Sequence, residues 1–487
     1  MDFVSLEFYL FLFVVLAAYY LVPPRFRWYV LLAGSFAYFW LATVSVRSLV
    51  VFIGIIVVSW AFGLVLEAVG HSNRDVFARK LVVVVCVALV LIPLVLSKFQ
   101  PLLATIETLL GCSNTGVVVS IGLSFFTMQI IAYLVDVYRG TVAAQHNFLK
   151  YTLFVSFFPQ IIQGPIPRYE QLEPQLVEGH RFDARGVTKG FMLILWGFFL
   201  KFMIADKAGV VVDAIFGNTD AYRGVYVLVG GVLYSVQLYA DFLACTTLAR
   251  GVAELFGIQL VNNFDHPYLS CSIKEFWGRW HISLSSWLRD YVYIPLGGNR
   301  KGALRRYINV AITFAVSGIW HGTGWKYLLW GLMHAAYQIV GELTQRLRDR
   351  FFALLGISAQ SDARRWISRT TTFVLVMLAW IVFRASSTSE ALFMLHSLVA
   401  TYNPWVLFDD SLLELGLGWK QWIVLLASIG LLIQVSVWQG RMSLCDRVLE
   451  QPFVVRCMLY VVTIVCIMVF GTYGYGFDAA DFIYGGF

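Results

Sequence analysis

Charge is scarce in this sequence of 487 residues: Asp, Glu, Lys and Arg together account for 13%, whereas hydrophobic residues account for 59%. Globular domains carry about 25% charged residues, so this composition excludes a water-soluble fold. Internal repeats, low-complexity tracts and long polar linkers are also missing, which argues against repeat architectures and against separately folding domains. We therefore expect one integral membrane domain over residues 1–487.

Patterns that would indicate metal, disulfide or phosphate chemistry are absent as well. The cysteines form no CxxC pair and no zinc spacing, and His281, His321 and His334 do not recur at helical ligand intervals. These absences argue against a disulfide framework, a metal centre and any bound cofactor. A GxSxG motif and a Gly-rich phosphate loop are missing too, which excludes a serine hydrolase of that type and an ATP-driven pump.

Long apolar runs are what the sequence does contain. A helix needs roughly 20 apolar residues to cross the hydrocarbon core, and helices satisfy their own backbone hydrogen bonds there. We predict an all-α polytopic membrane protein with 11–13 transmembrane helices. The runs lie near 5–22, 28–44, 48–69, 81–97, 115–138, 188–205, 225–247, 307–320, 324–343, 370–384, 420–437 and 453–471.

Basic residues are concentrated in alternate short loops between these runs. Because positively charged loops stay in the cytoplasm, they place the amino terminus outside and make the plasma membrane the expected location. The first run lacks a small-residue cleavage site and reads as a retained anchor. The basic residues include Arg25, Arg27, Arg74, Arg79, Lys80, Arg139, Lys150, Arg300, Lys301, Arg305 and Arg306.

Three segments do not read as simple spans: 151–187, 250–306 and 317–326. In the first, Pro165 and Pro167 bracket Ile166, and proline removes an amide donor and restricts the residue before it. This backbone either enters the bundle and returns, or forms a proline-rich surface loop. Irregular backbone at membrane depth requires protein or a water-filled cavity around it.

The stretch FWGRWHISLSSWLRDYVYIPLGGNR at 276–300 carries an unusual load of charge and tryptophan. From 274 to 291 its large apolar residues recur at the three- and four-residue spacing of one helical face. We predict one amphipathic helix lying in the membrane interface, since tryptophan prefers the headgroup level and arginine snorkels. His281 falls on the apolar face, either as a core histidine with a backbone partner or as a functional group.

A second histidine stands at the junction of two apolar runs, in the segment SGIWHGTGWK at 317–326. Gly322 and Gly324 break the helix there and leave His321 near membrane depth. Ionisable residues in such places face a cavity or the bundle interior and count as functional candidates. A neutral imidazole suits general-base chemistry on a hydroxyl.

Several longer motifs resemble those of the membrane-bound O-acyltransferase family, in its bacterial branch of alginate O-acetylation and teichoic acid D-alanylation proteins. The resemblance covers most of the chain, and the two Trp-His blocks together make it specific. The motifs are IGLSFFTMQIIAYLVDVYRG (121–140), SFFPQIIQGPIPR (156–168), NFDHPYLS (263–270), EFWGRWHISLSSWLRDYVYIPLGGNR (275–300), SGIWHGTGWKYLLWGLMHA (317–335) and FIYGGF at the end.

The resemblance implies a fold in which interfacial and re-entrant helices form a central funnel. It would place N-terminal spans in 1–150, the catalytic core in 151–345 and C-terminal spans in 346–487. His321 matches the family's catalytic histidine and His281 its second characteristic position. The implied substrate-binding residues are Trp277, Arg279, Trp280, Arg289, Asp290, Ser317, Trp320 and Asp241.

One block departs from the branch's pattern. Where relatives commonly continue an aspartate with Phe-Ser-Gly-Tyr-Ser-Asp, this chain keeps Asp241 but reads Phe-Leu-Ala-Cys-Thr-Thr through Thr247. If that block lines the donor tunnel, the donor or its fit differs here. Asp241 itself is either functional or a structural aspartate paired with a nearby cation.

Three functions remain open at this point. The first is transfer of acetyl from a cytoplasmic thioester, acetyl-CoA or an acyl carrier, to an extracytoplasmic polysaccharide directly or through an SGNH-type partner. The second is D-alanyl transfer from a carrier protein to the teichoic acid machinery. The third is a transporter without covalent chemistry, which broken helices and an intramembrane histidine also fit.

Overall fold

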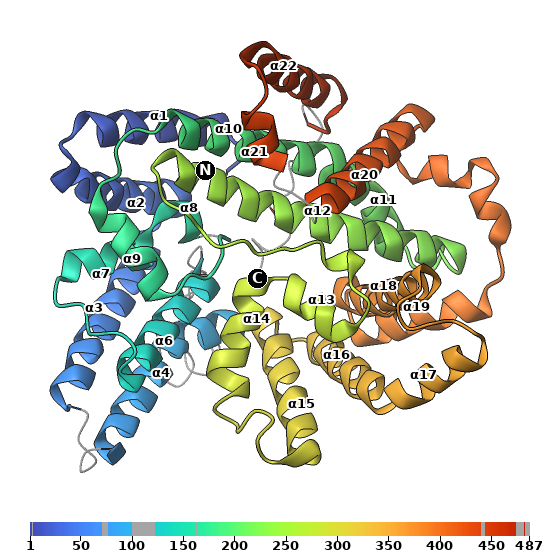
Figure 1. The fold of residues 1–487 in the computed structure, drawn as a ribbon, viewed down its shortest axis with the longest axis horizontal. Coiled ribbons are helices and arrows are strands. Elements are labelled where there is room, and N and C mark those ends of the chain that lie inside the picture. The colour runs from blue at the N-terminus through green and yellow to red at the C-terminus, as the bar shows by residue number, and fades with distance from the viewer. Residues whose placement is uncertain are drawn as a thin grey trace, which may run out of the picture. The chain divides into compact units, whose positions relative to one another are not determined.

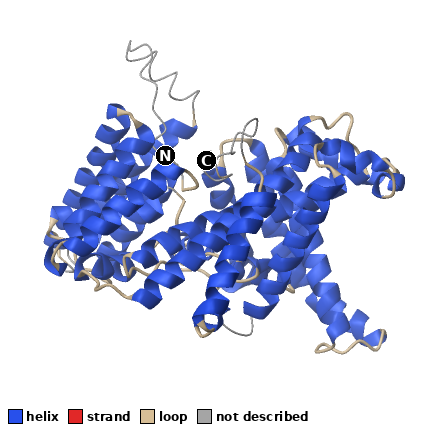
Figure 2. Cartoon of the chain, turned by 90° about the horizontal axis from the view of Figure 1, so that it is seen from above, coloured by secondary structure: helices blue, strands red, loops and turns tan. Residues whose placement is uncertain are grey.

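The computed structural model describes residues 1, 3–70, 76–99, 122–161, 163–439, 444–473 and 482. Over these residues the chain is helical, with short connecting loops and no strand longer than a single bridge (Figure 2). Serine side chains begin many of the helices: Ser5, Ser45 and Ser272 each accept a hydrogen bond from a backbone N–H in the first turn. Such caps satisfy amide groups that a helix start otherwise leaves unpaired. The predicted all-α class is confirmed.

The chain forms two compact units, and it passes between them at residues 194/195, 244/245 and 261/262. The first unit comprises the described residues of 1–194 and 245–261. In Figure 1, α3, α4 and α6 run side by side within it. Its principal described helices are α1 (Leu6–Leu21), α2 (Arg27–Thr43), α3 (Val46–Ala68), α4 (Val76–Lys98), α6 (Leu123–Arg139), α7 (Phe148–Ser156), α8 (Phe158–Ile161), α9 (Tyr169–Glu178), the first part of α10 (Ala184–Phe199) and the last part of α12 (Val225–Leu255).

The second unit comprises residues 195–244 and 262–483 and holds both Trp-His blocks. It includes parts of α10 and of the long helix α12 (Val225–Leu255). Its other principal helices are η3 (Leu200–Ala205), α11 (Asp206–Gly217), α13 (Ile273–Arg279), α14 (Ile282–Leu288), η5 (Arg289–Tyr293), α15 (Gly302–His321), α16 (Trp325–Leu343), α17 (Gln345–Leu354), α18 (Asp362–Arg384), α19 (Thr388–Ala400), α20 (Trp419–Gln439), α21 (Leu444–Leu449) and α22 (Phe453–Phe470).

Every predicted apolar run coincides at least in part with a described helix. Among the described residues, seven helices are long and apolar enough to cross a membrane by length and composition. The others are shorter, like α1 with 16 residues, or carry charges at one end, like α15 with Arg305 and Arg306. A polytopic membrane protein is therefore confirmed.

The proline-rich segment behaves as its sequence predicts. Helix α8 ends at Ile161, and the described backbone from 163 to 168 is not helical before α9 begins at Tyr169. This stretch is buried: Gln163 is 3% exposed and Ile166 5%. The irregular backbone is thus surrounded by protein, which excludes the surface-loop alternative for these residues.

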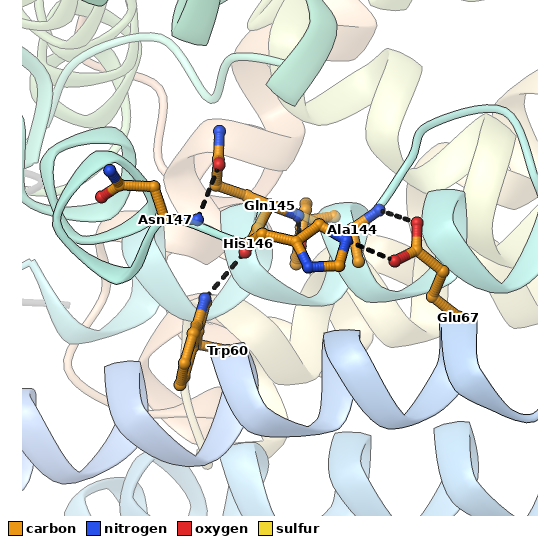
Figure 3. Close-up of polar contacts among 7 residues, drawn as sticks. Trp60, Glu67, Ala144, Gln145, His146 and Asn147 are labelled. Carbon is orange, nitrogen blue, oxygen red and sulfur yellow. Dashed lines mark hydrogen bonds and ion pairs between the residues drawn. The ribbon is translucent and has the colours of Figure 1, made fainter.

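The loop from 140 to 147, between α6 and α7, is fixed by polar contacts with α3 (Figure 3). Glu67 accepts from the Ala144 N–H at 3.1 Å and pairs with His146 Nε2 at 2.7 Å. Trp60 Nε1 donates to the Gln145 carbonyl at 2.7 Å. Glu67 and His146 therefore hold this loop in place in the first unit.

Two glycines bring α15 and α16 into close contact in the second unit. A Cβ added at Gly318 would lie 2.4 Å from the Tyr327 carbonyl oxygen, and one at Gly331 would lie 2.3 Å from that of Phe314. Real Cβ atoms do not approach so closely, so only glycine fits at these positions. The close approach presses the inner faces of the two helices together, and those faces carry His321 and His334.

Candidate active site

The predicted single helix over 274–291 is wrong, because the structure breaks it at the Trp-His pair. Helix α13 ends at Arg279, Trp280 is extended, and His281 has φ of 45° in the left-handed region. A histidine rarely adopts this conformation. Helix α14 then starts at Ile282 and passes into a π-helical turn over Arg289–Tyr293.

Segment 262–265 holds the break in place. Phe264 forms an antiparallel bridge with Trp280, and the Asp265 N–H donates to the Arg279 carbonyl at 3.0 Å. Asn263 then binds the far side of the break: its carbonyl accepts from the Ile282 N–H at 3.0 Å and its Oδ1 from the Ser283 N–H at 3.1 Å. These contacts take the place of the helical hydrogen bonds and fix His281 between them.

Replacing Asn263 with alanine should loosen this break. Asn263 is fully buried, and the substitution leaves the Ser283 N–H without its acceptor, which costs about 1–3 kcal/mol. We expect a lower melting temperature of the detergent-purified protein. Asn299→Ala, an exposed asparagine in the loop after η5, serves as the control, and an equal effect of the two substitutions would contradict this role.

His281 lies inside a set of aromatic rings. It is 1% exposed, and its ring contacts Phe242 of α12 edge-on at a centroid distance of 4.7 Å and Trp320 of α15 at 6.3 Å. Burial lowers the pKa of His281 to about 3, so the imidazole is neutral at physiological pH. The apolar face that the sequence predicts for this stretch is buried as well, with Trp280 and Leu284 each 1% exposed.

His321 occupies the last position of α15, as the glycines predict. Gly322 caps the helix, Gly324 precedes α16, and His321 is 2% exposed. Three rings enclose its imidazole at centroid distances of 4.7 Å (Trp320), 5.0 Å (Trp330) and 5.3 Å (Phe383). Because Trp320 contacts both histidines, it joins the two Trp-His blocks into one cluster.

A third histidine extends this cluster, although the sequence analysis assigned it no role. His334, one helical turn after Trp330 on α16, is fully buried. Its ring lies 5.2 Å from Trp330 and 5.0 Å from Trp277. The signal available in the sequence was its spacing of four residues from Trp330, which puts both on one helical face.

The predicted substrate-binding residues fall into two groups. Trp277, Trp280 and Trp320 lie in the aromatic cluster, and Ser317 is 1% exposed on the face of α15 that carries His321. The charged residues do not join them. Arg279 pairs with Glu275 at 2.8 Å, and the largely exposed Arg289 pairs with its neighbour Asp290 at 2.8 Å.

Asp241 of α12 belongs to a buried ion cluster. Lys201 Nζ lies 2.9 Å from Asp241 Oδ1 and 2.9 Å from Asp206 Oδ1, and all three side chains are at most 3% exposed. Of the two alternatives that the sequence left open for Asp241, the structure shows the second: the aspartate is paired with a cation. Lys201 and Asp206 were not predicted, although charges that interrupt the apolar run at 188–205 are the kind of signal that marks such residues.

Within the described ranges, no group of three or more His, Cys, Asp or Glu side chains is arranged to hold a metal ion. What the cluster offers is imidazoles and indole N–H groups inside a shell of aromatic rings. Such a site can accept and donate protons while it keeps bulk water away from the reacting atoms.

Residues 138–382 match the sequence profile of the membrane-bound O-acyltransferase family, and this stretch contains every histidine of the cluster. The chain belongs to that family and is an O-acyltransferase. A transporter without covalent chemistry is thereby excluded as its class.

Similarity to individual relatives extends over most of the sequence. The chain is 34% identical to the probable alginate O-acetylase of Pseudomonas aeruginosa over 413 residues, which cover 82% of this chain and 75% of that protein. It is 34% identical to the peptidoglycan O-acetyltransferase of Helicobacter pylori over 58% of this chain and 57% of that protein. It is 31% identical to the teichoic acid D-alanyltransferase of Bacillus subtilis over 50% of this chain and 64% of that protein.

Proposed function

We propose that this protein moves an acetyl group from acetyl-CoA on the cytoplasmic side of a bacterial plasma membrane to a hydroxyl group on the outer side. The final acceptor is an extracytoplasmic polysaccharide, reached directly or through a secreted SGNH-type acetyltransferase. The alginate O-acetylases among the relatives support acetyl as the acyl group, because the one from Pseudomonas aeruginosa matches 82% of the chain, whereas the D-alanyltransferases match 61% and 50%.

His321 carries the chemistry in this proposal. Its neutral imidazole removes the proton from the acceptor hydroxyl as the oxygen attacks the thioester carbon. The tetrahedral intermediate then collapses, and the departing thiolate takes the proton back from the imidazolium. The products are an acetyl ester and free thiol, and His321 returns to its neutral form.

The observation that carries the proposal is the enclosure of His321. The imidazole is 2% exposed and is surrounded by Trp320, Trp330 and Phe383. The reacting groups must therefore meet it inside the protein, where hydrolysis of the thioester competes poorly with transfer. His281 would help to position the acceptor, since its neutral ring shares the Trp320 contact.

A reconstitution experiment tests the acyl group and the direction of transfer together. Purified protein in liposomes receives radiolabelled acetyl-CoA or D-alanyl-loaded carrier protein in the outer buffer, with acceptor polysaccharide and an SGNH-type partner sealed inside. We expect acetyl label on the enclosed acceptor and none from the D-alanyl carrier. Transfer of D-alanyl alone would replace the proposal with teichoic acid D-alanylation, and label confined to the outer face would refute transfer across the membrane.

A further inference from the structure

The rings beside His321 include hydrogen-bond donors that no described residue accepts. Trp277 and Trp330 each hold a buried indole N–H without a partner among the described residues, and both ring nitrogens of His334 are in the same state. Trp330 and His334 are fully buried. Buried polar groups without partners are costly and uncommon in proteins, so three neighbouring ones call for an explanation.

These three side chains form one mutual contact set. The ring of Trp277 lies 5.7 Å from that of Trp330 and 5.0 Å from that of His334, and Trp330 and His334 are 5.2 Å apart. They come from two elements, α13 and α16, which pack directly against each other. Phe314 of α15 closes the set, 5.4 Å from Trp277 and 6.1 Å from His334.

The set adjoins the proposed base. The ring of Trp330 contacts that of His321 at a centroid distance of 5.0 Å and that of His334 at 5.2 Å. On α15, Ser317 lies between Phe314 and His321 on the same helical face, and its buried hydroxyl also has no partner among the described residues. A group bound by the indoles and His334 would therefore lie next to the position where His321 acts.

The chemistry of the donors defines what they would bind. An indole nitrogen donates and cannot accept, and a neutral imidazole offers one donor and one acceptor. A matching ligand presents an acceptor oxygen within an otherwise apolar group. The two indoles and the imidazole together offer three donors against a single acceptor, so the set favours an oxygen that only accepts, and the carbonyl of an acetyl thioester has this form.

We propose that Trp277, Trp330 and His334 form the seat of the donor's carbonyl oxygen, named here the carbonyl seat. This inference rests on the proposed function, because it assigns the donor half of the reaction that His321 catalyses. When the acceptor oxygen attacks, negative charge develops on the carbonyl oxygen, and the N–H groups stabilise it. Fixed donors in a water-poor site are well suited to this task, since they need no reorientation during the reaction.

Three substitutions in the reconstituted full-length protein test the carbonyl seat, with acetyl-CoA as the donor. Trp330→Phe keeps an aromatic ring but removes the N–H together with part of the indole, and we expect kcat to fall about a hundredfold with a much smaller change in the KM for acetyl-CoA. His334→Leu should act similarly, whereas His334→Gln keeps an amide donor and should retain most of the turnover. If His334→Gln keeps the turnover that His334→Leu loses, the effect comes from hydrogen bonding and not from side-chain packing.

The control is Trp287→Phe, which alters another buried tryptophan of the second unit, on α14, outside the contact set; it should keep kcat near the wild-type value. His321→Ala is assayed alongside. If wild type transfers acetyl and His321→Ala does not, yet Trp330→Phe and His334→Leu turn over normally, the carbonyl seat is wrong and the base stands. If His321→Ala transfers as wild type does, the general-base role fails, and if wild type itself transfers no acetyl, the proposed function fails. Should Trp330→Phe fail to fold, the two His334 variants test the carbonyl seat. A higher kcat for His334→Gln than for His334→Leu supports it, and equal kcat values refute it.

Discussion

Acyl transfer should fall by about a hundredfold to ten-thousandfold in kcat when His321 is replaced with alanine, the range that a positioned general base contributes. The substitution removes the only group proposed to take the hydroxyl proton and to return it to the thiolate. The KM for acetyl-CoA should change little, because the imidazole acts on the acceptor and on the leaving group rather than on the bulk of the donor. Steady-state kinetics in liposomes measures both quantities.

An exposed histidine provides the control for this loss. His396 lies on α19 with its side chain exposed, and His396→Ala should transfer acetyl at the wild-type rate. Melting temperatures of the two variants show whether the fold is retained. A His321→Ala protein that is well folded and fully active would disprove the general-base role, and one that fails to bind acetyl-CoA would make His321 a binding residue instead.

Both histidines could be predicted as candidates from the sequence for a simple reason. Each interrupts an otherwise apolar pattern, and at His321 the flanking glycines also mark the end of a helix. The structure confirms the helix end that the glycines predict, since α15 ends at His321 and α16 begins at Trp325. A histidine in an apolar stretch can therefore be recognised from the local sequence alone.

The helix break at Trp280 and His281 could not be predicted from the sequence in the same way. The three- and four-residue spacing of apolar residues continues through the break, so local periodicity predicts one helix. What interrupts the helix is pairing with segment 262–265, through Phe264 and Asn263. Such pairing depends on residues distant from the helix pattern, and a single sequence does not specify it.

The carbonyl seat could not be predicted from the sequence either. Tryptophan and histidine on helical faces usually pack in a core, so Trp330 and His334 carry no distinctive signal. Only the geometry shows that their rings contact each other and that their ring nitrogens lack partners among the described residues. Charges such as Lys201 are visible in the sequence, but their partners are not.

Replacing Lys201 with methionine should destabilise the protein by about 3–5 kcal/mol, the cost of leaving buried charges without their partner. Lys201 Nζ lies 2.9 Å from a carboxylate oxygen of both Asp206 and Asp241, and its side chain is 2% exposed. It also lies 4.6 Å from the centre of the Phe482 ring. Without the ammonium, two carboxylates remain close together in a nonpolar environment. Thermal unfolding in detergent, followed by loss of the monodisperse peak, measures the effect.

Lys189 offers a matched control, because it forms an ion pair of the same length in a different environment. Its Nζ lies 2.9 Å from Glu254 Oε1, but its side chain is 32% exposed. Partly exposed pairs contribute about 0–1 kcal/mol, so Lys189→Met should lower the melting temperature only slightly. Asp241→Asn, which leaves Lys201 paired with Asp206, should fall between the two. Equal shifts for Lys201→Met and Lys189→Met would show that burial does not set the strength of this cluster, since burial is the property in which the two pairs differ most.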